Sequence, residues 1–184
     1  MLFKNVFVAA TALFGFAAAS PVGVAEKSVL PRQASAIKTA LLAAQAQTIT
    51  LRDTFAAATG TDPNEVTTLR AQSASLLNSI NAATAVVQAS PALTLLDVLG
   101  FASTVSSLQQ TLDSTLDVVV SKKPQVDSLG LTAEVHQTLL DQKAAIDNFG
   151  VVLLTKVPTA AKSIAQGYIN NFDASFNTAI AAYA

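Results

Sequence analysis

Apolar side chains recur every three or four residues along most of this chain, which is the spacing of one face of an α-helix. The pattern is most pronounced in residues 132–154, where this face comprises Val135, Leu139, Gln142, Ile146, Phe149 and Leu153. Charged residues such as Glu134 and Lys143 fall mostly off that face. A helix with so much apolar surface on one side needs other helices to cover it.

The same periodicity predicts four more helices, in residues 33–58, 63–89, 93–121 and 158–183. In the segment 93–121, Leu93, Leu96 and Leu99 form a short apolar segment that Phe101 and later residues continue, and Gly100 at the junction predicts either a kink or a break. Spacings sustained over this many turns are typical of helices that pack into a bundle, and no segment shows the alternation of a β-strand. We therefore expect an all-α fold, an antiparallel bundle of about five amphipathic helices.

Three local signals refine the helix boundaries. Asp62, Pro63 and Glu65 predict a helix start, because they combine an N-cap acceptor, a proline that loses no amide bond and an acid in the first turn. Thr132 is expected to cap the helix in residues 132–154. Gly150 lies inside that helix, where glycine costs about 1 kcal/mol relative to alanine. Either a neighbouring helix approaches closely there or the helix bends.

The N-terminal residues have the pattern of an export signal. Lys4 supplies a positive charge, residues 6–16 form a short apolar run, and small residues at 17–19 provide a cleavage site. We predict a signal peptide in residues 1–19, a flexible leader or propeptide in residues 20–32, and a single helical domain in residues 33–184. The protein is thus expected to be secreted and extracellular, with no transmembrane anchor.

Composition excludes several classes of protein. The chain has 184 residues and no cysteine, so disulfides and thiolate metal sites are absent. Charged residues make up only 12% and the net charge is −1, which argues against nucleic acid as a partner. Hydrophobic residues reach 51% with only 6% aromatics, and the many small apolar side chains suit close helix packing.

Catalytic patterns are missing from the sequence. His136 is the one histidine, and its place beside the apolar face of its helix is typical of an ordinary boundary residue. Asp113 and Asp117 have helical spacing, but their polar neighbours indicate a solvated face rather than a pair of catalytic carboxylates. We predict that the protein is not an enzyme and that it uses no cofactor and no metal.

The remaining candidate for function is the apolar interior, which either packs solid or leaves a cavity along the bundle axis. If there is a cavity, its apolar lining is expected to include Leu41, Phe55, Leu69, Leu76, Leu108, Leu112, Leu139, Ile146, Phe149, Tyr168, Phe172 and Phe176. Three polar residues on the same faces, Thr48, Ser73 and Gln142, are candidate contacts for the head group of a lipid. In helices, however, Ser and Thr side chains commonly bond back to a carbonyl four residues earlier.

Three runs of sequence carry a resemblance to a known family. They are LLDQKAAIDNFGVVLLTKVP at 139–158, PALTLLDVLGFASTVSSLQQTLDSTLDVVVSKKP at 91–124, and the ending AIAAYA. Together they resemble the hydrophobic surface-binding protein A family of filamentous fungi, which includes the antigenic cell wall galactomannoproteins. The resemblance implies a secreted five-helix domain without enzymatic activity, and it carries over no individual binding residue.

What the resemblance implies about function leaves three alternatives. The first is a protein that binds hydrophobic surfaces or lipids and recruits a secreted polyester hydrolase to a hydrophobic substrate. The second is a soluble fatty-acid carrier with the acyl chain held between the helices, and the third is a structural or antigenic protein of the cell wall. Because no Ser/Thr-rich stalk or hydrophobic tail follows the last helix, we expect wall association, if any, without a GPI anchor.

Overall fold

The computed structural model describes residues 30–184, all of whose regular elements are helical. The predicted signal peptide and most of the predicted leader lie outside these residues. The elements are α1 (Leu30–Ala57), α2 (Pro63–Ala89), α3 (Leu95–Ser121), α4 (Lys123–Ser128), α5 (Thr132–Lys156), the 3-10 turn η1 (Thr159–Ala161) and α6 (Lys162–Tyr183). Five of them are long, as the hydrophobic pattern predicts.

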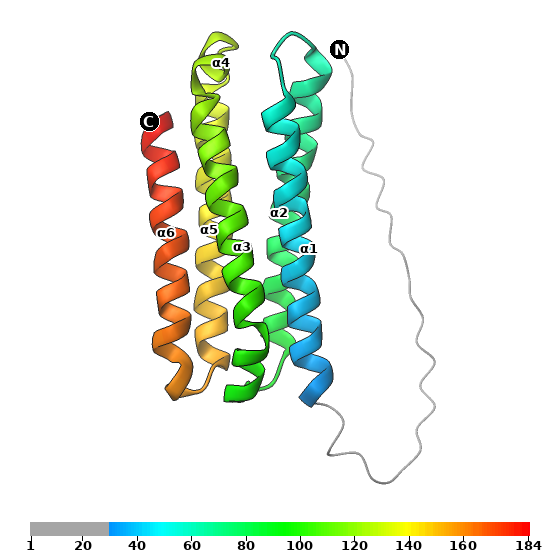
Figure 1. Ribbon diagram of the computed structural model, residues 1–184, viewed down its shortest axis with the longest axis vertical. Coiled ribbons are helices and arrows are strands. Elements are labelled where there is room, and N and C mark those ends of the chain that lie inside the picture. The colour runs from blue at the N-terminus through cyan, green and yellow to red at the C-terminus, as the bar shows by residue number, and fades with distance from the viewer. Residues whose placement is uncertain (1–29) are drawn as a thin grey trace, which may run out of the picture.

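The five long helices form a closed ring. Each packs mainly against two others, in the order α1, α2, α5, α6, α3 and back to α1. Consecutive long helices run in opposite directions, which confirms the antiparallel bundle (Figure 1). Neighbours in the ring that are separated in the sequence by one other long helix run parallel. One such pair is α1 and α3, where Gln45 contacts Thr111 and Arg52 contacts Ser114.

A ring of five helices leaves more room at its centre than a ring of four. With neighbouring helix axes about 9 Å apart, the centre lies about 7.7 Å from each axis in a five-membered ring and about 6.4 Å in a four-membered one. Because a helix with its side chains has a radius of about 5–6 Å, only large side chains can close the wider centre. Phe176, which is 1% exposed, is one of them.

The start of α2 confirms the predicted boundary. The Asp62 carboxylate accepts a hydrogen bond from the Asn64 amide at 2.8 Å, and Pro63 is the first helical residue. Glu65 accepts hydrogen bonds from the amides of Thr59 and Gly60 in the preceding loop. These amides hold the pKa of the Glu65 carboxyl below its usual range. The acid therefore ties the connection between α1 and α2 to the helix it starts.

Gly150 marks a close approach between helices, the first of the two alternatives. A Cβ atom at this position would lie 3.0 Å from Cδ1 of Ile169 in α6. The α5 helix continues through Gly150 to Lys156 without a break. Glycine is thus used here for close packing of α5 and α6.

Several predicted boundaries differ from those observed. The first helix begins at Leu30 instead of residue 33, since Pro31 is tolerated in a first turn. Thr132 does not cap α5: it is the first helical residue, and its hydroxyl donates to Asp127 of α4. The helix α4 itself was not predicted, because six residues are too few to show a periodic pattern.

The start of α3 differs in a way that matters for function. Thr94 caps this helix together with Asp97 in a reciprocal capping box, so that Leu93 precedes the helix and is buried. Leu96 and Leu99 follow the cap and are 80% and 55% exposed. The buried residues of these turns are Val98 and Phe101, so the apolar segment predicted from Leu93, Leu96 and Leu99 does not form one buried face.

Candidate functional site

The helices of the ring line two cavities, one in each half of the bundle, and the second is partly open to solvent. The first, which we call the α6 cavity, has a volume of about 80 Å³ and is lined by all five long helices. Its walls include Leu41, Ala83, Phe101, Ile146, Phe149, Tyr168, Phe172 and Phe176. Nearly all of its surface is hydrocarbon, so it offers an environment for an alkyl chain and almost nothing for a polar group.

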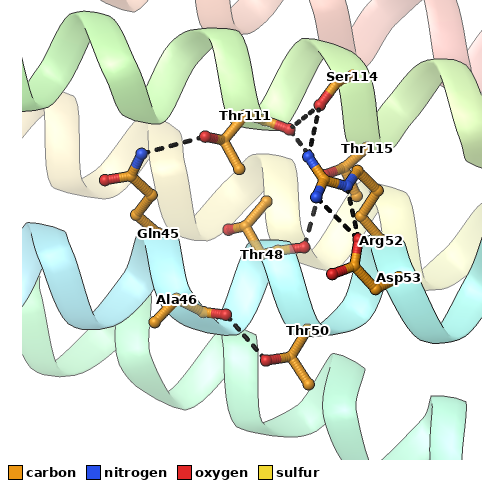
Figure 2. Close-up of polar contacts among 9 residues, drawn as sticks. All are labelled: Gln45, Ala46, Thr48, Thr50, Arg52, Asp53, Thr111, Ser114 and Thr115. Atoms are coloured by element: carbon orange, nitrogen blue, oxygen red, sulfur yellow. Dashed lines mark hydrogen bonds and ion pairs between the residues drawn. The ribbon is translucent and has the colours of Figure 1, made fainter.

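Thr48 is the polar residue most deeply placed in the α6 cavity, and its hydroxyl is already satisfied. It donates to the carbonyl of Ala44 at 2.8 Å, and the Thr48 carbonyl faces the hydroxyl of Thr115 at 3.5 Å. Figure 2 shows Thr48 and Thr115 among the polar contacts between α1 and α3, where Arg52 donates hydrogen bonds to both Asp53 and Ser114. These contacts lie beside the cavity and hold the two parallel helices together.

The second cavity lies in the half of the bundle that α4 closes, and we call it the α4 cavity. Its volume is about 270 Å³, close to the lower end of the range of about 300–1,000 Å³ that is usual for ligand pockets. Apolar side chains from α1, α2, α4 and α5 make most of its wall, among them Leu51, Phe55, Leu69, Leu77, Val126, Leu131 and Leu139. Unlike the α6 cavity, it also contains polar and charged groups.

An ion pair between α2 and α5 lies at the edge of the α4 cavity. The guanidinium of Arg70 donates two hydrogen bonds to the Glu134 carboxylate, with Nη2 to Oε2 at 2.6 Å. This pairing lowers the pKa of Glu134 and raises that of Arg70, because each charge stabilises the other. Both side chains are about half exposed, so the pair joins the two helices at the surface.

Gln142 is the most deeply buried polar side chain of the α4 cavity. It is 4% exposed, and its amide nitrogen has no hydrogen-bond partner among the described residues. Ser73, half-buried on α2, lines the same cavity. Buried amides are usually hydrogen-bonded, so an unpaired one indicates a place for a further polar group.

The structure therefore distributes the predicted lining over both cavities. In the α6 cavity lie Leu41, Leu76, Leu108, Leu112, Ile146, Phe149, Tyr168, Phe172, Phe176 and the candidate head-group residue Thr48. In the α4 cavity lie Phe55, Leu69, Leu139 and the candidate head-group residues Ser73 and Gln142. Their roles in binding stay predictions. The sequence reasoning missed Arg70 and Glu134, because residues 64 positions apart show no local sign of their contact.

The side chains considered for catalysis do not assemble into a site. His136 is half-buried on α5, Asp113 accepts a hydrogen bond from Ser175 at 2.6 Å, and Asp117 is exposed. Within residues 30–184, no group of three or more His, Asp or Glu side chains is placed to hold a metal ion. Every helix of this part of the chain also falls short of the length and apolar character that a bilayer-crossing segment requires.

The described residues thus form a ring of five long helices with two cavities whose walls are mainly hydrocarbon. The family described as Hydrophobic surface binding protein A matches residues 34–155. The chain belongs to this family and is not an enzyme.

The relatives that the chain matches are proteins of the fungal cell wall. Cell wall mannoprotein 1 of Aspergillus fumigatus is 28% identical over 138 residues, which cover 75% of this chain and 48% of that protein. The protein of the same name from Aspergillus flavus is 26% identical over 124 residues, covering 67% and 44%. The chain thus spans about half the length of these relatives.

Two solved structures share the fold. AFMP4P in complex with palmitic acid superposes with a TM-score of 0.78 at 28% identity, covering 82% of this chain and 99% of that one. Ligand binding domain 1 of the Penicillium marneffei MP1 protein, complexed with arachidonic acids, also gives 0.78, at 19% identity and with 83% and 99% covered. At that identity the second likeness shows the fold alone.

Proposed function

We propose that this protein binds a fatty acid, with the acyl chain held inside the helical ring along the α6 cavity. The observation that carries the proposal is the lining of that cavity, which is almost entirely hydrocarbon and comes from all five long helices. Burial of each methylene contributes about 0.8 kcal/mol, so a long chain gains affinity without any polar contact in the interior. The similar AFMP4P structure holds palmitic acid, which supports this choice of ligand.

At about 80 Å³ the α6 cavity is smaller than the usual ligand pocket, so a long acyl chain must displace side chains as it enters. Tyr168 and Phe149, both half-buried, stand on α6 and α5 at its wall. In the proposed complex the acyl chain lies among such rings and the carboxylate stays in water at the cavity mouth.

We further propose that the protein acts outside the cell, since its relatives are cell wall mannoproteins and residues 1–19 have the pattern of a signal peptide.

Palmitate is expected to stabilise the delipidated protein against heat. A ligand that binds only the folded state adds about 2.7 kcal/mol of stability at a free concentration of 100 Kd. For a domain of this size that corresponds to a rise in Tm of about 5–11 °C. The measurement is a calorimetric Tm with and without palmitate, after solvent extraction of the protein. An unchanged Tm at saturating palmitate would contradict the proposal.

A second candidate function, adsorption to a hydrophobic solid, is favoured by the exposed leucines at one end of the bundle. Leu95, Leu96 and Leu99 lie at the start of α3, at the end of the bundle where α5 stops and α6 begins (Figure 1). A backbone hydrogen bond from Leu93 to Lys156 holds these two ends together. Exposed apolar side chains gathered at one end of a protein are typical of a contact surface.

Leu96→Glu with Leu99→Glu is expected to lower the affinity for polyester particles at least about tenfold, because both side chains lose their apolar contact with the solid. Adsorption of the unmodified protein is expected to persist at high salt, since charge contributes little. The matched control is Leu42→Glu with Leu140→Glu, two exposed leucines elsewhere on the bundle. Bound protein is measured by depletion from solution. Equal losses in the two double variants would argue against a role for this end.

A further inference from the structure

The α4 cavity contains features that an acyl chain in the α6 cavity does not use. Gln142 of α5 is one of its lining residues, and the amide nitrogen of this side chain is buried and lacks a partner among the described residues. Leaving a buried amide unpaired costs more than a single hydrogen bond normally contributes to stability. A ligand oxygen that accepts a hydrogen bond from Gln142 would remove that cost.

Two parallel helices, α2 and α5, line opposite walls of the α4 cavity. On α5, Glu134, Thr138 and Gln142 are each four residues apart and so share one face, and all three line the cavity. On α2, Ser73 follows Arg70 by three residues and lines the opposite wall. Gln142 lies eight residues from Glu134, about 12 Å along the helix. Because Gln142 is 4% exposed, a ligand atom that bonds to it must lie below the surface of the bundle.

The charges around the α4 cavity disfavour an anion. Its charged lining consists of three acids and two bases: Glu65, Glu134, Asp141, Arg70 and Lys122. Both bases are engaged, Arg70 by Glu134 and Lys122 by the carbonyl of Ala58 at 2.8 Å. An anionic head group would find no free cation here and would meet a net negative charge. An uncharged acceptor has no such penalty.

We propose that the α4 cavity is a separate binding site for a short apolar chain that carries an uncharged carbonyl oxygen, as an ester does. Gln142 donates a hydrogen bond to that carbonyl, and the hydrocarbon part contacts the apolar wall formed by Phe55, Leu69 and Leu139. The volume of about 270 Å³ suits a chain of modest length. The site goes beyond the fatty-acid binding proposed above, which uses a different cavity and a charged head group.

The test uses methyl octanoate and octanoate with the full-length protein labelled with ¹⁵N. The side-chain amide signals of Gln142 are identified as those missing in Gln142→Met, a variant expected to fold because it removes an unpaired polar group. Methyl octanoate is expected to shift these signals and to bind Gln142→Met about tenfold more weakly than the unmodified protein. At pH 7, octanoate is expected to bind at least about tenfold more weakly than the ester, because the cavity has no free cation.

Three controls make the outcome decisive. Gln88→Met, at an exposed position of α2, is expected to leave ester binding unchanged. Ala83→Leu, which adds atoms in the α6 cavity, is also expected to leave ester binding unchanged. Loss of ester binding in that variant would show that the ester does not have a separate site. No ester binding at all, equal binding to Gln142→Met, unmoved Gln142 signals or tighter binding of octanoate would each overturn the proposal. The binding of palmitate to the unmodified protein, which tests the α6 cavity, is measured independently.

Discussion

Ala83→Leu is expected to lower the affinity for palmitate by at least about tenfold, and to do so without unfolding the protein. Ala83 lies on α2, is buried, and lines the α6 cavity. Three additional carbon atoms in a cavity of about 80 Å³ occupy the space that the acyl chain needs. Each methylene kept out of the bundle removes about 0.8 kcal/mol of binding free energy, so exclusion of two suffices for a tenfold loss.

Ala82→Leu is the matched control for this variant. Ala82 is the preceding residue of α2 and is exposed, so the same substitution adds the same atoms on the solvent side. Titration with palmitate, followed by calorimetry, gives both affinities, and thermal unfolding shows whether each variant folds. If Ala83→Leu folds and binds palmitate as tightly as Ala82→Leu does, the acyl chain does not occupy the α6 cavity.

Phe176→Ala is expected to reduce the free energy of unfolding by about 3–5 kcal/mol, the range for large aromatic residues in protein cores. Phe176 of α6 is among the most completely buried large side chains, and it lines the α6 cavity to which all five long helices contribute. A loss of this size lowers Tm by about 6–20 °C in a domain of this length. Denaturant unfolding of the ligand-free protein measures it.

The neighbouring exposed residue provides the control for Phe176. Asn177→Ala is expected to change the free energy of unfolding by no more than about 0.5 kcal/mol, as is usual for surface positions. A loss of unfolding free energy below about 1.5 kcal/mol for Phe176→Ala would contradict the prediction. It would mean that the surrounding side chains move to fill the space that the ring of Phe176 leaves.

The helices could be predicted from the sequence because the signals that define a helix lie within a short stretch of residues. The three-and-four spacing of α5 and the start signal at Asp62 and Pro63 depend on residues within a few turns. The close approach at Gly150 was one of two physical alternatives, and the structure decided it through Ile169. Spacing alone did not separate the exposed Leu96 from the buried Val98 and Phe101, because all three are apolar residues of the first turns of α3.

The site could be predicted only in part, because its shape depends on the order of helices in the ring. A residue such as Leu139 is correctly expected to face the interior, but nothing local shows that it lies in a different cavity from Phe149. The contact between Arg70 and Glu134 depends on the parallel packing of α2 against α5, which no short segment encodes. Gln142 was visible as a polar interruption of an apolar face, and this interruption is what gives the α4 cavity its buried donor.

The central claim, that the helical ring holds an acyl chain, is tested most directly by native mass spectrometry of the delipidated protein with palmitate. We predict a folded species that carries one palmitate per chain, persists when free palmitate is removed, and is depleted in Ala83→Leu but not in Ala82→Leu. A species without bound palmitate, or one whose palmitate number rises with concentration without a preferred value, would contradict the claim.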